Sequence, residues 1–135
     1  MTLTALYNIA ECDNIKVDAF ALGLCESLSI SDNGECFIAI DPFKIKSTAD
    51  ETVKLAHELG HCETGAFYNQ YALIDDRAKQ ERRATKWAIK MLVPEGELKE
   101  ACRYLTNRWE LSLHFGVTED FMQQAMDYYN NEKYF

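Results

Sequence analysis

The chain has 135 residues, of which 47% are hydrophobic and 27% charged, and its formal net charge is −8. This length predicts one domain whose folded form needs no disulfide or metal to hold it together. The sequence has no run of about eighteen apolar residues, and residues 1–14 lack a secretory signal, so we expect a cytoplasmic protein without a membrane partner. The negative charge disfavours binding to a phosphate backbone.

The first 46 residues predict one helix and a small sheet. Residues 2–11 have helical spacing, and residues 14–17 form a candidate short strand. Polar and apolar residues alternate over 26–31, an Asp-Asn-Gly turn follows, and 35–41 is rich in β-branched and aromatic residues, so we expect a hairpin. Residues 36–40 are either an exposed edge strand that pairs with an extended peptide or an ordinary core strand.

The middle of the chain predicts two long helices. Ser47 and Thr48, followed three residues later by acidic residues, indicate a helix that runs to about His61. It is apolar over most of its circumference, so it should be central and buried. A second helix should span 75–93, since Pro94 disfavours helical geometry in the preceding residue. Three short amphipathic helices are expected after Pro94.

The five cysteines suggest neither a disulfide framework nor a thiolate zinc site. Their number is odd, and no two of them form a C-x-x-C pair. We therefore expect buried, reduced thiols.

Two of the three histidines, His57 and His61, lie four residues apart and enclose an H-E-x-x-H motif. Residues at this spacing share one helix face, so two imidazoles can converge on one ion. In zinc hydrolases with this motif the glutamate, here Glu58, acts as general base. The alternative is a surface helix with both histidines in water, which the buried character of the helix disfavours.

A catalytic zinc site normally has three protein ligands, and Glu81 is the best third candidate. It lies on the second predicted helix within the apolar stripe of Ala78, Ala84, Ala88 and Met91. An unpaired carboxylate would be costly to bury there, and coordination of a metal would remove that cost. The alternative is an ion pair with Arg77, four residues earlier.

The segments HELGHCETGAFYN and ERRATKWAIKMLVP resemble the ImmA/IrrE family of zinc metallopeptidases. The resemblance implies an α+β, zincin-like domain over 1–135 that holds one Zn²⁺ ion. Its parts are an N-terminal helix and small sheet (1–46), the zinc-site helices (47–93) and a helical C-terminal part (94–135). It also implies His57, His61 and Glu81 as ligands and Glu58 as the catalytic base.

The resemblance extends to WELSLHFGVTEDFMQQAM, which is similar to the C-terminal segment of phage and mobile-element members. It implies a protease that cleaves a partner helix-turn-helix repressor and thereby relieves repression of transcription. Thr85 departs from the family pattern, which usually has Asp or Asn at this position. The donor that stabilises the oxyanion stays unassigned among Tyr68, Tyr71 and His114.

Three alternatives to a protease remain open. The segment 110–126 has the pattern of a DNA-binding helix-turn-helix, but residues 106–130 carry a net charge of −3, which opposes DNA binding. Residues 77–90 carry a net charge of +5, typical of a solvated helix face and also able to dock an acidic partner or nucleic acid. The third alternative is a metal-containing anti-repressor that binds the repressor without proteolysis.

Overall fold

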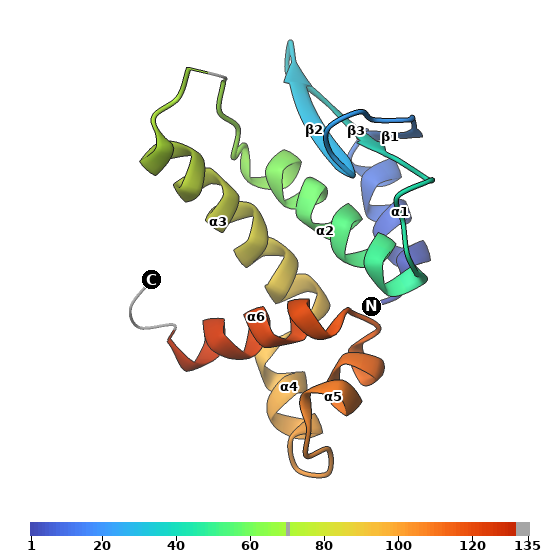
Figure 1. Cartoon of the computed structure of the whole chain (residues 1–135), viewed down its shortest axis with the longest axis vertical. Helices are drawn as coiled ribbons and strands as arrows, with labels where there is room; N and C mark the ends of the chain where they lie inside the picture. The colour runs from blue at the N-terminus through green and yellow to red at the C-terminus, as the bar shows by residue number, and fades with distance from the viewer. Residues whose placement is uncertain (70, 132–135) are drawn as a thin grey trace.

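The computed structural model describes residues 1–69 and 71–131 and has an α+β architecture (Figure 1). In these residues helix α1 (Leu3–Cys12) precedes strands β1 (Lys16–Ala19), β2 (Ser27–Asp32) and β3 (Glu35–Ile40). Helices α2 (Thr48–Thr64) and α3 (Ile74–Leu92) follow, and then α4 (Glu95–Ala101), α5 (Arg108–Phe115) and α6 (Glu119–Asn130). The sheet and α1 lie on one side of α2, α3 runs beside α2, and α4 to α6 gather at the other end of the molecule.

The sheet has the order β1-β3-β2, with β1 parallel and β2 antiparallel to β3. The hairpin is confirmed: Asp32 pairs with Glu35, and the loop residues Asn33 and Gly34 both have positive φ. This is the backbone conformation that an Asn-Gly hairpin turn requires.

The interpretation of residues 36–40 as an exposed edge strand is wrong. These residues lie in β3, which is the central strand and is paired on both sides, so its backbone groups are already used. Among the described residues β1 and β2 each pair only with β3, so β2 has a free edge. A two-residue hairpin fixes which strands are neighbours, but the later position of β1 beside β3 is a tertiary outcome.

Helix α2 is the buried helix that the sequence predicts. The hydroxyl of Ser47 accepts from the backbone N–H of Asp50 at 3.1 Å and caps the first turn. Gly65 ends the helix in the left-handed region, with φ of 65°. Leu55, Ala56 and Leu59 are fully buried, so α2 lies in the hydrophobic core along most of its length.

Helices α2 and α3 approach very closely at Gly60. A Cβ at this position would overlap the backbone carbonyl of Ala84, so no side chain fits between the helices here. The contact brings residue 81 of α3 level with His57 and His61 of α2. The glycine inside the H-E-x-x-H motif is therefore a packing requirement.

The C-terminal part contains the three short helices that the sequence predicts. Side chains of Asn107 and Thr118 cap the first turns of α5 and α6, and Gly116, in the left-handed region, ends α5. None of the helices within 1–69 and 71–131 combines the length and apolar character that a membrane span needs. The division into one domain with three parts stays a prediction.

The expectation of reduced, buried thiols is wrong for most of the cysteines. Cys36 of β3 and Cys62 of α2 form a disulfide, and Cys12 and Cys102 are exposed. The bonded pair is 26 residues apart in sequence, with a Cα–Cα distance of 5.9 Å. Packing of the sheet on α2 brings the two residues together, and no local spacing signals such a contact.

Candidate metal centre

His57, His61 and Glu81 converge on one point between α2 and α3. The Nε2 atom of His57 lies 2.7 Å from Oε2 of Glu81, and Nε2 of His61 lies 3.3 Å from the same oxygen. One ligand atom from each residue lies within 4.8 Å of the others. The helical repeat places the two histidines on one face of α2, and the approach of α3 at Gly60 supplies the carboxylate.

The chemistry of the donors fits a divalent metal. The Nδ1–H of His61 donates to the carbonyl of Ala66, because a carbonyl oxygen can only accept. Nε2 of His61 then carries a lone pair, which faces the carboxylate of Glu81, itself an acceptor. A cation placed between two acceptors satisfies both, and two imidazoles with one carboxylate are a common donor set for catalytic zinc.

Glu81 is oriented by Tyr68, which follows α2 in the connection to α3. The Tyr68 hydroxyl donates to Oε1 of Glu81 at 2.8 Å and leaves Oε2 for the histidines. Burial raises the pKa of Glu81, but the Tyr68 hydrogen bond and the attraction of the two imidazoles in their protonated form outweigh burial and hold this pKa below its ordinary value. Glu81 therefore faces the site as a carboxylate.

Thr85 lies one turn after Glu81 on α3 and supports His57. Its hydroxyl lies 3.3 Å from Nδ1 of His57, whereas Glu81 contacts Nε2, the other nitrogen of the ring. A hydroxyl at this position can orient the imidazole, although an acidic residue would polarise it more strongly. The departure from the family pattern thus keeps a polar contact to the histidine.

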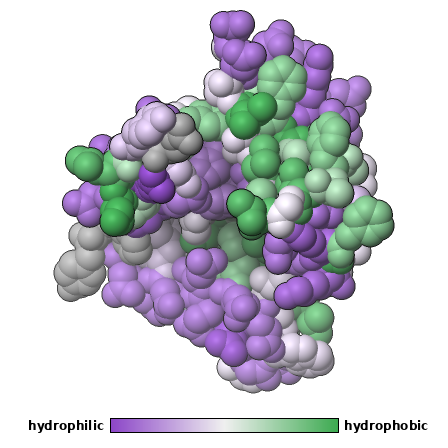
Figure 2. Space-filling view, turned by 45° about the horizontal axis from the view of Figure 1, so that its top comes forward, coloured by the Kyte–Doolittle hydropathy of each residue, from purple (hydrophilic) through white to green (hydrophobic). Residues whose placement is uncertain are grey.

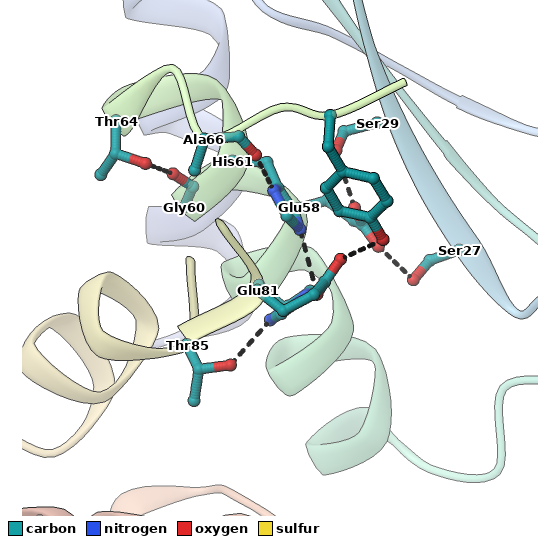
Figure 3. A network of polar contacts seen from close by, with 11 residues as sticks. Ser27, Ser29, Glu58, Gly60, His61, Thr64, Ala66, Glu81 and Thr85 are labelled. Carbon is teal, nitrogen blue, oxygen red and sulfur yellow. Dashed lines mark hydrogen bonds and ion pairs between the residues drawn. The ribbon is translucent and has the colours of Figure 1, made fainter. Parts of the chain in front are cut away.

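The carboxylate of Glu58 is held by two serines of strand β2. Ser27 donates to one carboxylate oxygen at 2.7 Å, and Ser29 donates to the other at 2.8 Å. Figure 3 shows both serines directed toward Glu58. Glu58 is only 6% exposed, so these two hydroxyls are its main polar partners.

In β2 two polar side chains face the protein interior and an apolar side chain faces solvent, which is the reverse of the usual amphipathic strand. Ser27 and Ser29 face the buried carboxylate, whereas Ile30 is 53% exposed. Alternation in the sequence locates the strand correctly but does not tell which face is buried. Sequence analysis therefore missed these two residues, and the only available signal was serine at every second position of a predicted strand.

A cavity of about 440 Å³ gives access to the site. It is lined by residues of β2, α2, α3 and the connection between these helices, which include His57, Glu58, His61, Tyr68 and Glu81. Figure 2 shows that the molecule is hollowed near the centre of the face in view, with hydrophilic side chains below the hollow and hydrophobic ones at its upper right. The volume suits a short stretch of an extended chain.

The three candidate oxyanion donors are in different places. Only Tyr68 lines this cavity; Tyr71 is 83% exposed and lines a neighbouring hollow. His114 lies on α5, where its ring contacts Tyr104 and Phe115. Of the three, the geometry brings only Tyr68 to the metal centre.

Comparison with known families gives one match. The family model described as the IrrE N-terminal-like domain, peptidase M78, matches residues 36–127, which is more than half of the chain. The matched segment begins in β3 and includes all of α2 and α3. Neither a curated protein nor a solved structure matches the chain.

Proposed function

The chain belongs to the ImmA/IrrE family of metallopeptidases, and we propose that it is a zinc-dependent endopeptidase that cleaves a helix-turn-helix repressor of a phage or mobile element. The observation that carries the catalytic part is the convergence of His57, His61 and Glu81 beside the buried Glu58. We further infer a zincin-like fold, in which a small sheet packs on the helix that bears both histidines.

Zinc would be held by Nε2 of each histidine and by a carboxylate oxygen of Glu81. When bound, it supplies a Lewis acid that polarises the scissile carbonyl and makes water more acidic. The third donor comes from a separate helix, so the packing of α2 on α3 determines whether the site is complete.

Glu58 would act as the general base. Its carboxylate would accept a proton from the attacking water and then deliver it to the leaving amine. Ser27 and Ser29 would keep both carboxylate oxygens of Glu58 oriented. The partial burial of these contacts would limit the access of other water molecules to the carboxylate. Tyr68 would keep Glu81 in place through the hydrogen bond to Oε1.

The free edge of β2 would align the substrate. An extended peptide can add to an exposed edge strand through main-chain hydrogen bonds, and β2 borders the cavity that contains Glu58. A substrate strand beside β2 would bring its backbone carbonyls close to the site. In this proposal the substrate pairs with β2, and not with the central strand β3 that contains residues 36–40.

The choice of a repressor as substrate is supported by the resemblance of residues 109–126 to phage and mobile-element members of the family. The corresponding helices α5 and α6 carry more carboxylates than cations, which favours contact with a protein over contact with DNA. We therefore infer that this part of the chain serves packing or docking of the partner protein.

The test combines metal analysis with cleavage of a purified repressor encoded beside this protein. We expect about one zinc per chain, and cleavage products by mass spectrometry with the wild-type protein. Glu58→Gln should keep the metal and abolish cleavage, because it removes the base and leaves all three ligands. His61→Ala should lose both the metal and cleavage.

The same variants decide between a peptidase and an anti-repressor. Suppose that Glu58→Gln still relieves repression in cells and that intact repressor co-purifies with it. That result would replace proteolysis by sequestration, the alternative function. Wild-type protein that contains zinc and leaves the repressor uncut and unbound would refute both.

A further inference from the structure

A second groove, with a volume of about 460 Å³, lies between α3 and α6 and adjoins the metal centre. Glu81 and Thr85 belong both to the lining of this groove and to the contacts of the two histidines. Buried Ile89 and Tyr128 contribute apolar surface to it. A chain bound at the metal centre could therefore continue into this groove.

Cations dominate the wall that α3 contributes. Lys79, Arg82 and Lys86 follow one another at steps of three and four residues and so form a stripe along the helix. This stripe lies next to the face that carries Glu81 and Thr85. Arg83 is a fourth cation on the lining of the groove, and Glu81 and Asp127 are its two carboxylates. Positive charge therefore predominates in the groove, although the whole chain has a net charge of −8.

The three cations of this stripe have no counter-ion among the residues that the structure describes. Within the described parts of the chain no ion pair or hydrogen bond involves the side chains of Lys79, Arg82 or Lys86. Several cations elsewhere are paired, as in the ion pairs Lys54–Glu26, Lys99–Glu95 and Arg108–Glu119. A row of exposed, unpaired cations beside an apolar floor is complementary to an acidic ligand.

We propose that this groove binds an acidic segment of the protein substrate, with carboxylates of the segment on the α3 stripe and an apolar side chain over Ile89. This inference rests on the proposed peptidase function and adds the chemical class of the sequence that flanks the scissile bond. Nucleic acid fits less well, because Asp127 lies on the opposite wall and the net charge of the chain repels phosphate.

The experiment measures binding to the full-length, zinc-loaded Glu58→Gln variant, so that it does not depend on cleavage. The probes are a labelled ten-residue peptide that alternates Glu and Leu, the same peptide with Gln for every Glu, and a single-stranded oligo-dT. Exposed pairs contribute about two- to threefold each, so we expect about tenfold tighter binding of the acidic peptide, with a preference that shrinks as salt rises.

The matched variants change only the groove charge. Replacing Lys79, Arg82 and Lys86 together by Gln keeps good helix formers and should reduce the preference to nearly one. Lys90→Gln is the control, since Lys90 is exposed on the same helix and does not line the groove. It should keep the full preference.

Three results would overturn the proposal: equal binding of the two peptides, no measurable binding of the acidic peptide, or tighter binding of oligo-dT than of the acidic peptide. Unchanged preference in the triple variant would also overturn it. Failure of the wild-type protein to cut its repressor would count against the peptidase and leave the groove measurement valid. The two proposals can therefore fail separately.

Discussion

At the scale of single residues, the cleavage rate should depend on the contacts that hold the base as well as on the base itself. Glu58 is buried, and Ser27 and Ser29 each satisfy one of its oxygens. Replacing both serines by Ala should leave the three candidate ligands intact and the carboxylate short of two donors. We expect kcat to fall by about tenfold or more, with the metal content and KM unchanged. The free energy of unfolding, measured in urea, should also fall by about 1–3 kcal/mol, because the Glu58 carboxylate stays buried without these two donors.

The control for the serine pair lies on the same strand. Ser31 shares the face of Ser27 and Ser29, is exposed, and is not among the hydrogen-bond partners of Glu58 in the described residues, so Ser31→Ala should match the wild type. Thr at positions 27 and 29 keeps a hydroxyl and suits a strand, so it should restore much of the rate. If the double Ala variant cuts at the wild-type rate, the serines have no positioning role.

At the scale of elements, the site depends on how closely α3 packs on α2. Gly60 has the backbone carbonyl of Ala84 where a Cβ would lie. Because a backbone group cannot move aside as a side chain can, Gly60→Ala should separate the helices and cost about 1–3 kcal/mol. It should also weaken zinc binding by about tenfold, since Glu81 would move away from the histidines. Urea unfolding and zinc competition with a chelator measure the two effects.

Gly96 provides the matched comparison. It lies in α4, and a Cβ there would meet nothing within 4 Å. Gly96→Ala should keep the wild-type zinc affinity and leave stability equal or slightly higher, because Ala is the better helix former. Equal behaviour of the two substitutions would show that the close approach at Gly60 has no special role.

The elements that the sequence predicts well are those with local signals. The Asn-Gly turn, the Ser47 cap and the helical periodicity of α2 and α3 are each encoded within a few residues, and the structure contains all of them. The convergence of Glu81 with His57 and His61 was also predictable, because a carboxylate within an apolar stripe is expected to need a partner, although the Glu81 side chain is 41% exposed in the structure.

The features that sequence analysis missed depend on contacts between distant segments. The order of the sheet makes β3 central, and the disulfide between Cys36 and Cys62 depends on the packing of that strand against α2. The serine contacts to Glu58 depend on which face of β2 turns toward the helix. Each is decided by tertiary packing, for which a short sequence pattern carries no direct signal.

At the scale of the whole molecule, the disulfide ties the sheet to the helix of the metal centre. It closes a loop over a sequence separation of 26 residues, which stabilises a fold by about 3 kcal/mol, chiefly by restricting the unfolded chain. The double variant Cys36→Ser, Cys62→Ser should therefore unfold at lower urea than the oxidised wild type. A dithiol reductant should bring the wild type to the variant's midpoint, and Cys12→Ser, which removes an exposed free thiol, should change neither.

The dependence of stability on pH should reveal the interaction of two carboxyl groups, Glu63 near the end of α2 and Asp13 at the end of α1. Partial burial and the neighbouring Asp13 raise the pKa of Glu63 to about 7, from an ordinary value of 4.5. In the unfolded chain Glu63 loses its proton near the ordinary value, whereas in the folded protein it holds the proton until about pH 7. The stability that it contributes is therefore complete below about pH 4.5 and is lost as pH rises through 7.

Glu63→Gln isolates this effect because Gln resembles the protonated carboxyl at every pH. In thermal unfolding of the metal-free protein, we expect the variant to match the wild type near pH 4 and to have the higher Tm at pH 8. Asp13→Asn should give part of the same gain, because it removes the second cause of the shift and leaves burial, the larger one. The other titrating groups are common to all three proteins, so the difference in Tm between them reports this pair. A difference that stays constant from pH 4 to pH 8 would mean that Glu63 does not keep its proton in the folded protein.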